Sequence, residues 1–215
     1  MAIESTYLSN AVPGPYRKES ITMCSVPCSG HSLSHLNSAN FADPVDGYAK
    51  YIDVDSFINM YFVNELLKNK DAANFSSIYL YKDKNQKLKM GPAWDFDLVA
   101  GNSDINEIND PEGWHLKTRS PWFARLFQDP AFVAKVKAKW NSVKAQKIDT
   151  MDSYIDQMAY RIELSQQKNF VVWDIMNTQF WNIPLRGSHS AEVAAMKQWL
   201  KLRAAWMDQQ IQNGL

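Results

Sequence analysis

The stretch SSIYLYKDKNQKLKMGPAWDFDLVAGN, residues 76–102, decides the fold that we expect for this chain of 215 residues. Apolar and polar residues alternate over residues 76–82, and a second short run over 87–90 follows a polar turn. Alternation on both sides of a short turn predicts a β-hairpin. Two carboxylates, Asp95 and Asp97, therefore come just after the second strand of that hairpin.

Helical periodicity predicts most of the remaining structure. Asp55 or Ser56 offers a cap for the helix before the hairpin, and Asp129 followed by Pro130 is a strong start signal for a later one. The Lys and Arg residues of the last helix are expected to form its solvated face. We expect helices within residues 53–70, 120–128, 129–146, 148–169 and 190–212.

The predicted fold class is α+β and mostly helical, with one small β-hairpin bearing the acidic residues. Residues 1–44 are rich in Ser, Pro and Asn and lack helical or strand periodicity, so we expect them to be poorly ordered. Residues 45–215 are expected to hold the ordered domain, which is long enough for a sizeable core. Most of the 8 Trp, 9 Tyr and 10 Phe residues are expected in that core.

Composition argues against several classes of function. Lys plus Arg and Asp plus Glu number 23 each, so the formal net charge is zero and nothing supports binding to nucleic acid or to an anionic membrane surface. No apolar run has the length of a membrane span, and the first twenty residues lack the pattern of a secretory signal. Two cysteines exclude a disulfide framework.

The cysteines belong to a run of metal-ligand residue types, C-x3-C-x2-H-x3-H, formed by Cys24, Cys28, His31 and His35. Zinc binds such ligands, but zinc fingers separate the Cys pair from the His pair by about a dozen residues. Four ligands packed into so short a segment leave little chain to fold around an ion. We interpret them as two free thiols and two surface imidazoles.

The acidic pair Asp95 and Asp97 has two interpretations. Carboxylates among Trp, Phe and Leu neighbours suit a buried Mg²⁺ or Ca²⁺ ion, whereas an Asp in a turn also caps its own backbone. Asp71 and Asn74 favour the first interpretation, because they precede the first strand of the hairpin and a hairpin brings its outer ends together. The order Asp, Asn, strand pair, Asp is also that of the catalytic segment in protein kinases.

The stretch 51–102, with "YLYKD", "KLKMGP" and "WDFD" in that order, resembles the core of the CotH family, the kinases similar to spore coat protein H. The ending KQWLKLRAAWMDQQI resembles the helix that closes such domains, and the resemblance extends from about Asn40 to Leu215. It implies an atypical protein-kinase-like fold that uses ATP and Mg²⁺ or Mn²⁺ to phosphorylate protein hydroxyls. The resemblance also implies that the partners are spore coat or cell-surface proteins. The setting that it implies is the spore coat, the cell surface or the secreted fraction.

Carried over residue by residue, the resemblance makes Asp71 the base-like catalytic aspartate and Asp95 the metal-holding aspartate. Asp97 becomes a supporting acid near the metal. Asn74 matches the metal-holding asparagine less closely, since kinases place four residues between this Asp and Asn, whereas the present chain places two.

A kinase of this type also needs a nucleotide-binding lobe with a lysine on the phosphates. The residues before Asn40 contain no such setting, and Lys18 is a poor match, so we expect the chain to represent the C-terminal lobe and to transfer little phosphate alone. The alternative function is a non-catalytic assembly or binding module of the spore coat or cell surface on the same fold.

Overall fold

The computed structural model describes residues 34–74, 77–103, 108–178 and 185–215. They form a mostly helical domain with one two-stranded antiparallel sheet, as expected. The elements, in chain order, are η1 (His35–Asn37), η2 (Tyr48–Lys50), α2 (Val54–Leu66), η3 (Asp71–Asn74), β1 (Leu80–Tyr81), β2 (Lys89–Met90), α3 (Leu116–Arg119), α4 (Pro121–Leu126), α5 (Pro130–Val143), the π-helical η5 (Lys144–Ile148), α6 (Met151–Arg161), α7 (Glu163–Val172) and α8 (His189–Asn213).

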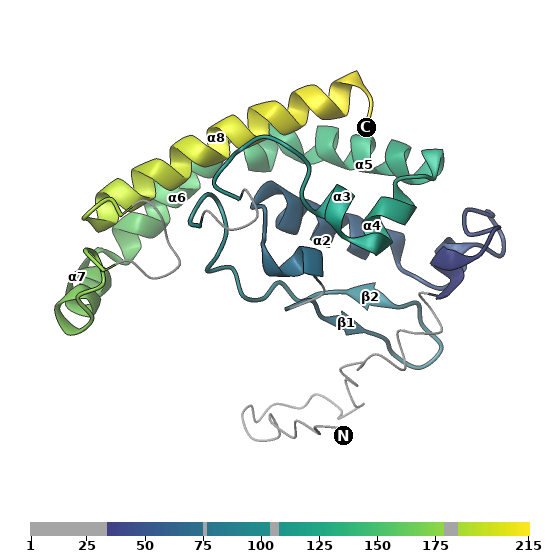
Figure 1. Ribbon diagram of the computed structural model, residues 1–215, viewed down its shortest axis with the longest axis horizontal. Helices are drawn as coiled ribbons and strands as arrows, with labels where there is room; N and C mark the ends of the chain where they lie inside the picture. The colour runs from purple at the N-terminus through teal and green to yellow at the C-terminus, as the bar shows by residue number, and fades with distance from the viewer. Residues whose placement is uncertain (1–33, 75–76, 104–107, 179–184) are drawn as a thin grey trace.

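Helix α2 lies at the centre of the domain. It contacts α5 and α8 on one side and β2 on the other, so the hairpin and the long C-terminal helix cover opposite sides of it (Figure 1). Its apolar face supplies Phe57, Tyr61 and Phe62, all buried. The Tyr61 ring packs on Phe123 of α4, and the Phe62 ring packs on Trp140 of α5. Aromatic packing thus joins the helices around α2.

The start of α2 differs from the expected one. Asp53 is the cap, because its side chain accepts a hydrogen bond of 3.0 Å from the backbone N–H of Ser56. The same residue donates its own backbone N–H to the carbonyl of Leu88, at 2.8 Å, beside a bridge between Ile52 and Leu88. Contact with the hairpin strand therefore selects Asp53 over the expected Asp55 or Ser56.

The predicted hairpin is confirmed, although its strands are shorter than expected. β1 and β2 pair antiparallel, with Leu80 opposite Met90 and Tyr81 opposite Lys89. Leu80 and Met90 are buried against the body of the domain, while the strand partners Tyr81 and Lys89 are half-buried. One face of this small sheet is thus fixed on the core, and the segment after Met90 leaves it toward the WDFD tetrapeptide.

Residues 34–44 differ from the expectation of a poorly ordered segment, since they pack on the helical body. Leu36 is 1% exposed, and Arg125 donates to the carbonyls of Leu36 and Ser38 at 2.9 and 3.1 Å. Its guanidinium lies 3.7 Å from the centroid of the Phe41 ring. The expectation for residues 1–33, with Cys24, Cys28 and His31, concerns residues outside the described ranges. His35, which we also expected to be a surface imidazole, stacks on the ring of Tyr51.

The helical region after the hairpin follows the periodicity with two exceptions. The cap of α5 is Asp129, as predicted, and its carboxylate accepts from the N–H of Ala131 at 2.9 Å. The single helix expected over 148–169 is interrupted at Ile162 and becomes α6 and α7. In α8, Arg203 is wholly buried, so the expectation of a solvated basic face is wrong at this position.

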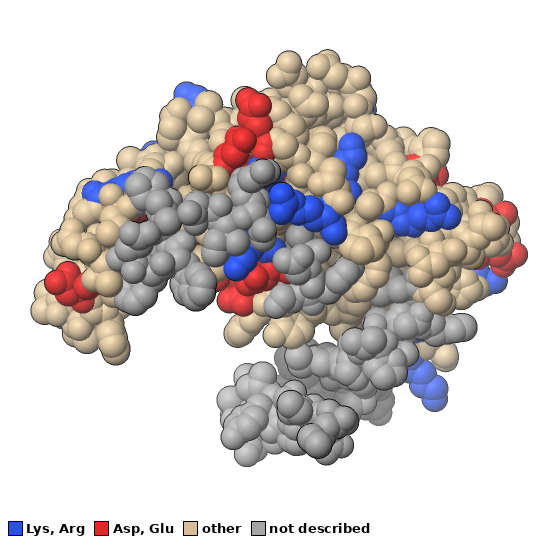
Figure 2. Space-filling model, in the orientation of Figure 1, with Lys and Arg blue, Asp and Glu red and all other residues tan. Residues whose placement is uncertain are grey.

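Charged side chains of both signs are interspersed over the described surface in Figure 2, with no single-sign patch on the face shown. This distribution agrees with the zero formal net charge. None of the helices in the described ranges combines the length and the apolarity that crossing a membrane requires.

Candidate functional site

Asp71 stands at the end of a hydrogen-bonded turn that follows α2. The buried Asn69 donates its backbone N–H to the carbonyl of Asn64, at 2.9 Å, and its side-chain amide to the Asn64 side chain, at 3.0 Å. Its side-chain oxygen then accepts from the backbone N–H of Asp71, at 3.2 Å. The half-buried Asp71 carboxylate accepts no hydrogen bond from any described residue. Asn74 closes η3, and its side chain lies outside the description.

Asp95 lies in the loop that leaves β2. Its backbone φ is +63°, in the left-handed region that Asp tolerates better than most residues. Its carboxylate oxygen Oδ2 accepts from the Ser77 hydroxyl at 2.7 Å, and Oδ1 accepts nothing from the described residues. Asp97 accepts from the N–H of Leu98 at 2.9 Å, while Asn102 donates to the Asp97 carbonyl at 3.0 Å and closes the loop.

Hydrogen bonds join the segments that carry Asp71 and Asp95. On one side, Ser77 follows η3 and binds Asp95 directly. On the other side, the backbone N–H of Ala100 donates to the carbonyl of Leu67, at 2.8 Å, just before the Asp71 turn. Both contacts join the segment before β1 to the segment after β2, and they lie on either side of Asp71 along the chain.

The surroundings of the acids differ from those expected for a buried ion. Asp95 and Asp97 are exposed, and the neighbouring Trp94 is 58% exposed. Within the described residues, no three His, Cys, Asp or Glu side chains are grouped to hold a metal. Exposed Asp oxygens nevertheless suit Mg²⁺ or Mn²⁺, because phosphoryl-transfer sites hold Mg²⁺ through one or two carboxylates plus the substrate phosphates. The donor set fits such an ion.

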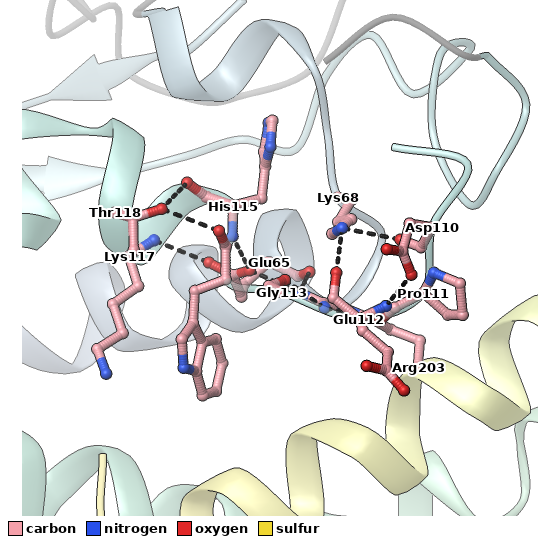
Figure 3. A network of polar contacts seen from close by, with 11 residues as sticks. Glu65, Lys68, Asp110, Pro111, Glu112, Gly113, His115, Lys117, Thr118 and Arg203 are labelled. Carbon is pink, nitrogen blue, oxygen red and sulfur yellow. Dashed lines mark hydrogen bonds and ion pairs between the residues drawn. The ribbon is translucent and has the colours of Figure 1, made fainter. Parts of the chain in front are cut away.

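A buried polar network joins α2 and α8 to the chain of residues 110–118 (Figure 3). Glu65 of α2 and Arg203 of α8 are both fully buried and form an ion pair with an Oε1–Nη2 distance of 2.6 Å. The Glu65 carboxylate also accepts the backbone N–H groups of His115 and Lys117, at 2.7 and 2.8 Å, and so satisfies free donors at the start of α3. The pair thus holds the chain that follows the acidic loop.

The imidazole of His115 is 1% exposed in this network. Its pKa is lowered from 6.5 to about 4, chiefly by burial and in addition by the nearby charges of Arg119 and Lys68, against hydrogen bonding at the Asn69 and Lys70 backbone. His115 is therefore neutral at physiological pH. Burial also lowers the pKa of Arg203, against the attraction of Glu65, yet an arginine stays protonated in proteins.

Sequence reasoning missed these buried charges, although their spacing contains a signal. Glu65 continues the apolar stripe formed by Phe57 and Tyr61 at intervals of four residues. Arg203 lies on the stripe of Leu200 and Met207, three residues after the first and four before the second. Opposite charges on the apolar stripes of two helices predict a buried ion pair between them.

Residues 31–207, most of the chain, match the family model described as "CotH kinase protein". The chain belongs to the CotH kinase family. The match begins before Asn40 and includes the acidic loop and the buried network. Comparisons of the sequence with curated proteins and with solved structures found no match. Membership of a kinase-like family implies ATP and a divalent metal in general, and it suggests protein substrates.

Proposed function

We propose that this CotH-family chain carries the acidic site of an ATP-dependent protein kinase that phosphorylates Ser or Thr hydroxyls. The proposal rests on one observation above all. The hydrogen bonds from Ser77 to Asp95 and from Ala100 to Leu67 hold two acidic segments together. Both carboxylate oxygens of Asp71 and the Oδ1 atom of Asp95 accept no hydrogen bond from the described residues. Free oxygens on a fixed frame are what a metal–phosphate site needs.

In the proposed mechanism, Asp71 accepts a hydrogen bond from the acceptor hydroxyl and orients its oxygen toward the phosphoryl group. Asp95 would hold the divalent ion, with Asp97 and Asn74 in support. The ion, when bound, supplies neutralisation of charge on the transferring group. Ser77 holds one oxygen of Asp95 and so fixes the direction of the other. The protein thus contributes position and charge rather than covalent chemistry.

Titration calorimetry with Mn²⁺ tests the metal site. Wild type should bind the ion, and Asp95→Ala should bind it at least about tenfold more weakly, since a carboxylate ligand is lost. Asp83→Ala is the matched control, because Asp83 is an exposed aspartate in the turn at the far end of the hairpin. Equal affinity of wild type and Asp95→Ala would refute the assignment.

A radiolabel transfer assay with ATP and a generic protein acceptor tests the reaction itself. Any transfer should be lost in Asp71→Asn, which keeps the size of the side chain but removes the charge that attracts the hydroxyl proton. Retention of transfer in that variant would remove Asp71 from the mechanism.

One observation favours the alternative, a non-catalytic binding module. Helix α7 and the residue after it expose large apolar side chains, with Leu164, Val171 and Trp173 at 74, 86 and 64% exposure. Exposed apolar side chains in a group are typical of protein contact surfaces. If wild type binds neither Mn²⁺ nor ATP, this alternative is preferred to the kinase.

A further inference from the structure

Two buried cations hold the backbone of residues 110–113 from two different elements. Lys68, beyond the end of α2, donates its ammonium to the carbonyls of Asp110, at 2.8 Å, and Glu112. Arg203 of α8 donates to the intervening carbonyls of Pro111 and Gly113, at 2.9 and 2.7 Å (Figure 3). Lys68 therefore binds the first and third carbonyls of this segment, and Arg203 binds the second and fourth. All four consecutive backbone acceptors have a charged donor.

The position of Lys68 distinguishes it from Arg203. Lys68 is 4% exposed and has a backbone φ of +46°, which is uncommon for a residue with a side chain. Its neighbour Leu67 accepts the N–H of Ala100 from the acidic loop, and its other neighbour Asn69 accepts the N–H of Asp71. Three successive residues therefore bind the acidic loop, the 110–113 segment and the Asp71 backbone.

We propose that Lys68 is a positioning residue for the acidic site. Its ammonium binds a segment that Arg203 holds from α8, so the turn between Leu67 and Asp71 is anchored through it to the rest of the domain. Without this anchor, the turn loses its tie to residues 110–113, and the contacts that Leu67 and Asn69 make with the two acidic segments become less fixed. Asp71 and Asp95 then lose their fixed relation. This inference rests on the proposed function for its metal readout alone.

Hydrogen exchange of backbone amides tests the anchoring without any ligand. In Lys68→Gln, the amides of Asp71 and Ala100 should exchange roughly tenfold faster than in wild type, since their acceptors lie beside the altered residue. Val136→Ala is the control, because Val136 is fully buried in α5 and its truncation lowers stability away from the turn. Unchanged exchange at Asp71 and Ala100 in folded Lys68→Gln overturns the proposal.

Mn²⁺ affinity provides the second readout. Lys68→Gln should bind Mn²⁺ about ten- to a hundredfold more weakly than wild type, as expected for loss of a residue that orients ligands. Lys68→Arg, which keeps a charged donor, should restore most of the affinity, whereas Val136→Ala should leave it unchanged.

The outcomes separate the two proposals. If wild type binds Mn²⁺ and folded Lys68→Gln binds it equally, the positioning role is wrong and the metal site stands. If wild type does not bind Mn²⁺, the metal site is wrong, and hydrogen exchange alone decides the positioning role. If Lys68→Gln does not fold, Lys68→Met decides by the same exchange measurement, because methionine keeps much of the length of the side chain but cannot donate to the two carbonyls. Wild-type exchange at Asp71 and Ala100 in that variant overturns the proposal.

Discussion

The buried imidazole of His115 should make the domain less stable in mild acid. Its pKa is about 4 in the folded protein and 6.5 as a reference for the unfolded chain. Between these values the unfolded state binds a proton that the folded state excludes, so the free energy of unfolding falls as the pH falls. Burial and the positive charges of Arg119 and Lys68 are the physical causes.

The size of this effect follows from the pKa difference. Each pKa unit corresponds to about 1.4 kcal/mol, so the interval from 6.5 to about 4 is worth about 3 kcal/mol in all. Most of it, roughly 2.5 kcal/mol, should be lost between pH 7.5 and pH 4.5. Below the folded-state pKa both states are protonated, and the contribution of His115 no longer changes.

Urea unfolding followed by tryptophan fluorescence measures this loss in wild type and in His115→Gln. Carboxylates titrate in the same range, so the decisive quantity is the difference between the two proteins in how much stability each loses. We expect wild type to lose about 2.5 kcal/mol more than His115→Gln over that interval. An equal loss in wild type and His115→Gln would refute the reasoning.

Two further variants test the fold around the site. Gly101→Ala should lower the free energy of unfolding by about 1–3 kcal/mol, because Gly101 has φ +79° and an added Cβ would lie 2.6 Å from a ring carbon of Trp199; thermal unfolding at wild-type temperature would contradict this. Arg125→Ala removes a donor to the Leu36 carbonyl and a cation on the Phe41 ring, so limited proteolysis should cut faster within residues 34–41. An unchanged cleavage pattern there would show that other contacts hold the segment.

The fold was predictable from sequence where local signals suffice. Helix α5 has a cap and a proline in the expected places, Asp129 and Pro130, and the hairpin has its alternation and polar turn. The start of α2 was not predictable in this way. Several acidic and hydroxyl side chains there can cap a helix, and the choice of Asp53 depends on its contact with Leu88, far along the chain.

The same distinction between local and long-range contacts applies to the candidate site. The hairpin predicts that the segments of Asp71 and Asp95 meet, because this follows from local pairing. The buried roles of Lys68 and Arg203 depend on segments distant in sequence, and a periodic pattern assigns charged helical residues to the solvated face. Only the position of Arg203 on an apolar stripe distinguishes it from the lysines of α8.

The Glu65–Arg203 pair has a consequence for the order in which the domain can fold. Its partners are separated by 138 residues, and Arg203 is the cation that pairs with Glu65 in the described structure. During synthesis, the α2 segment emerges long before α8, and until α8 arrives the Glu65 carboxylate has no counter-charge. A lone ionised carboxylate is too costly to bury, so α2 must keep that end hydrated. The core around Tyr61 and Glu65 therefore closes late, when the last helix docks and supplies its guanidinium.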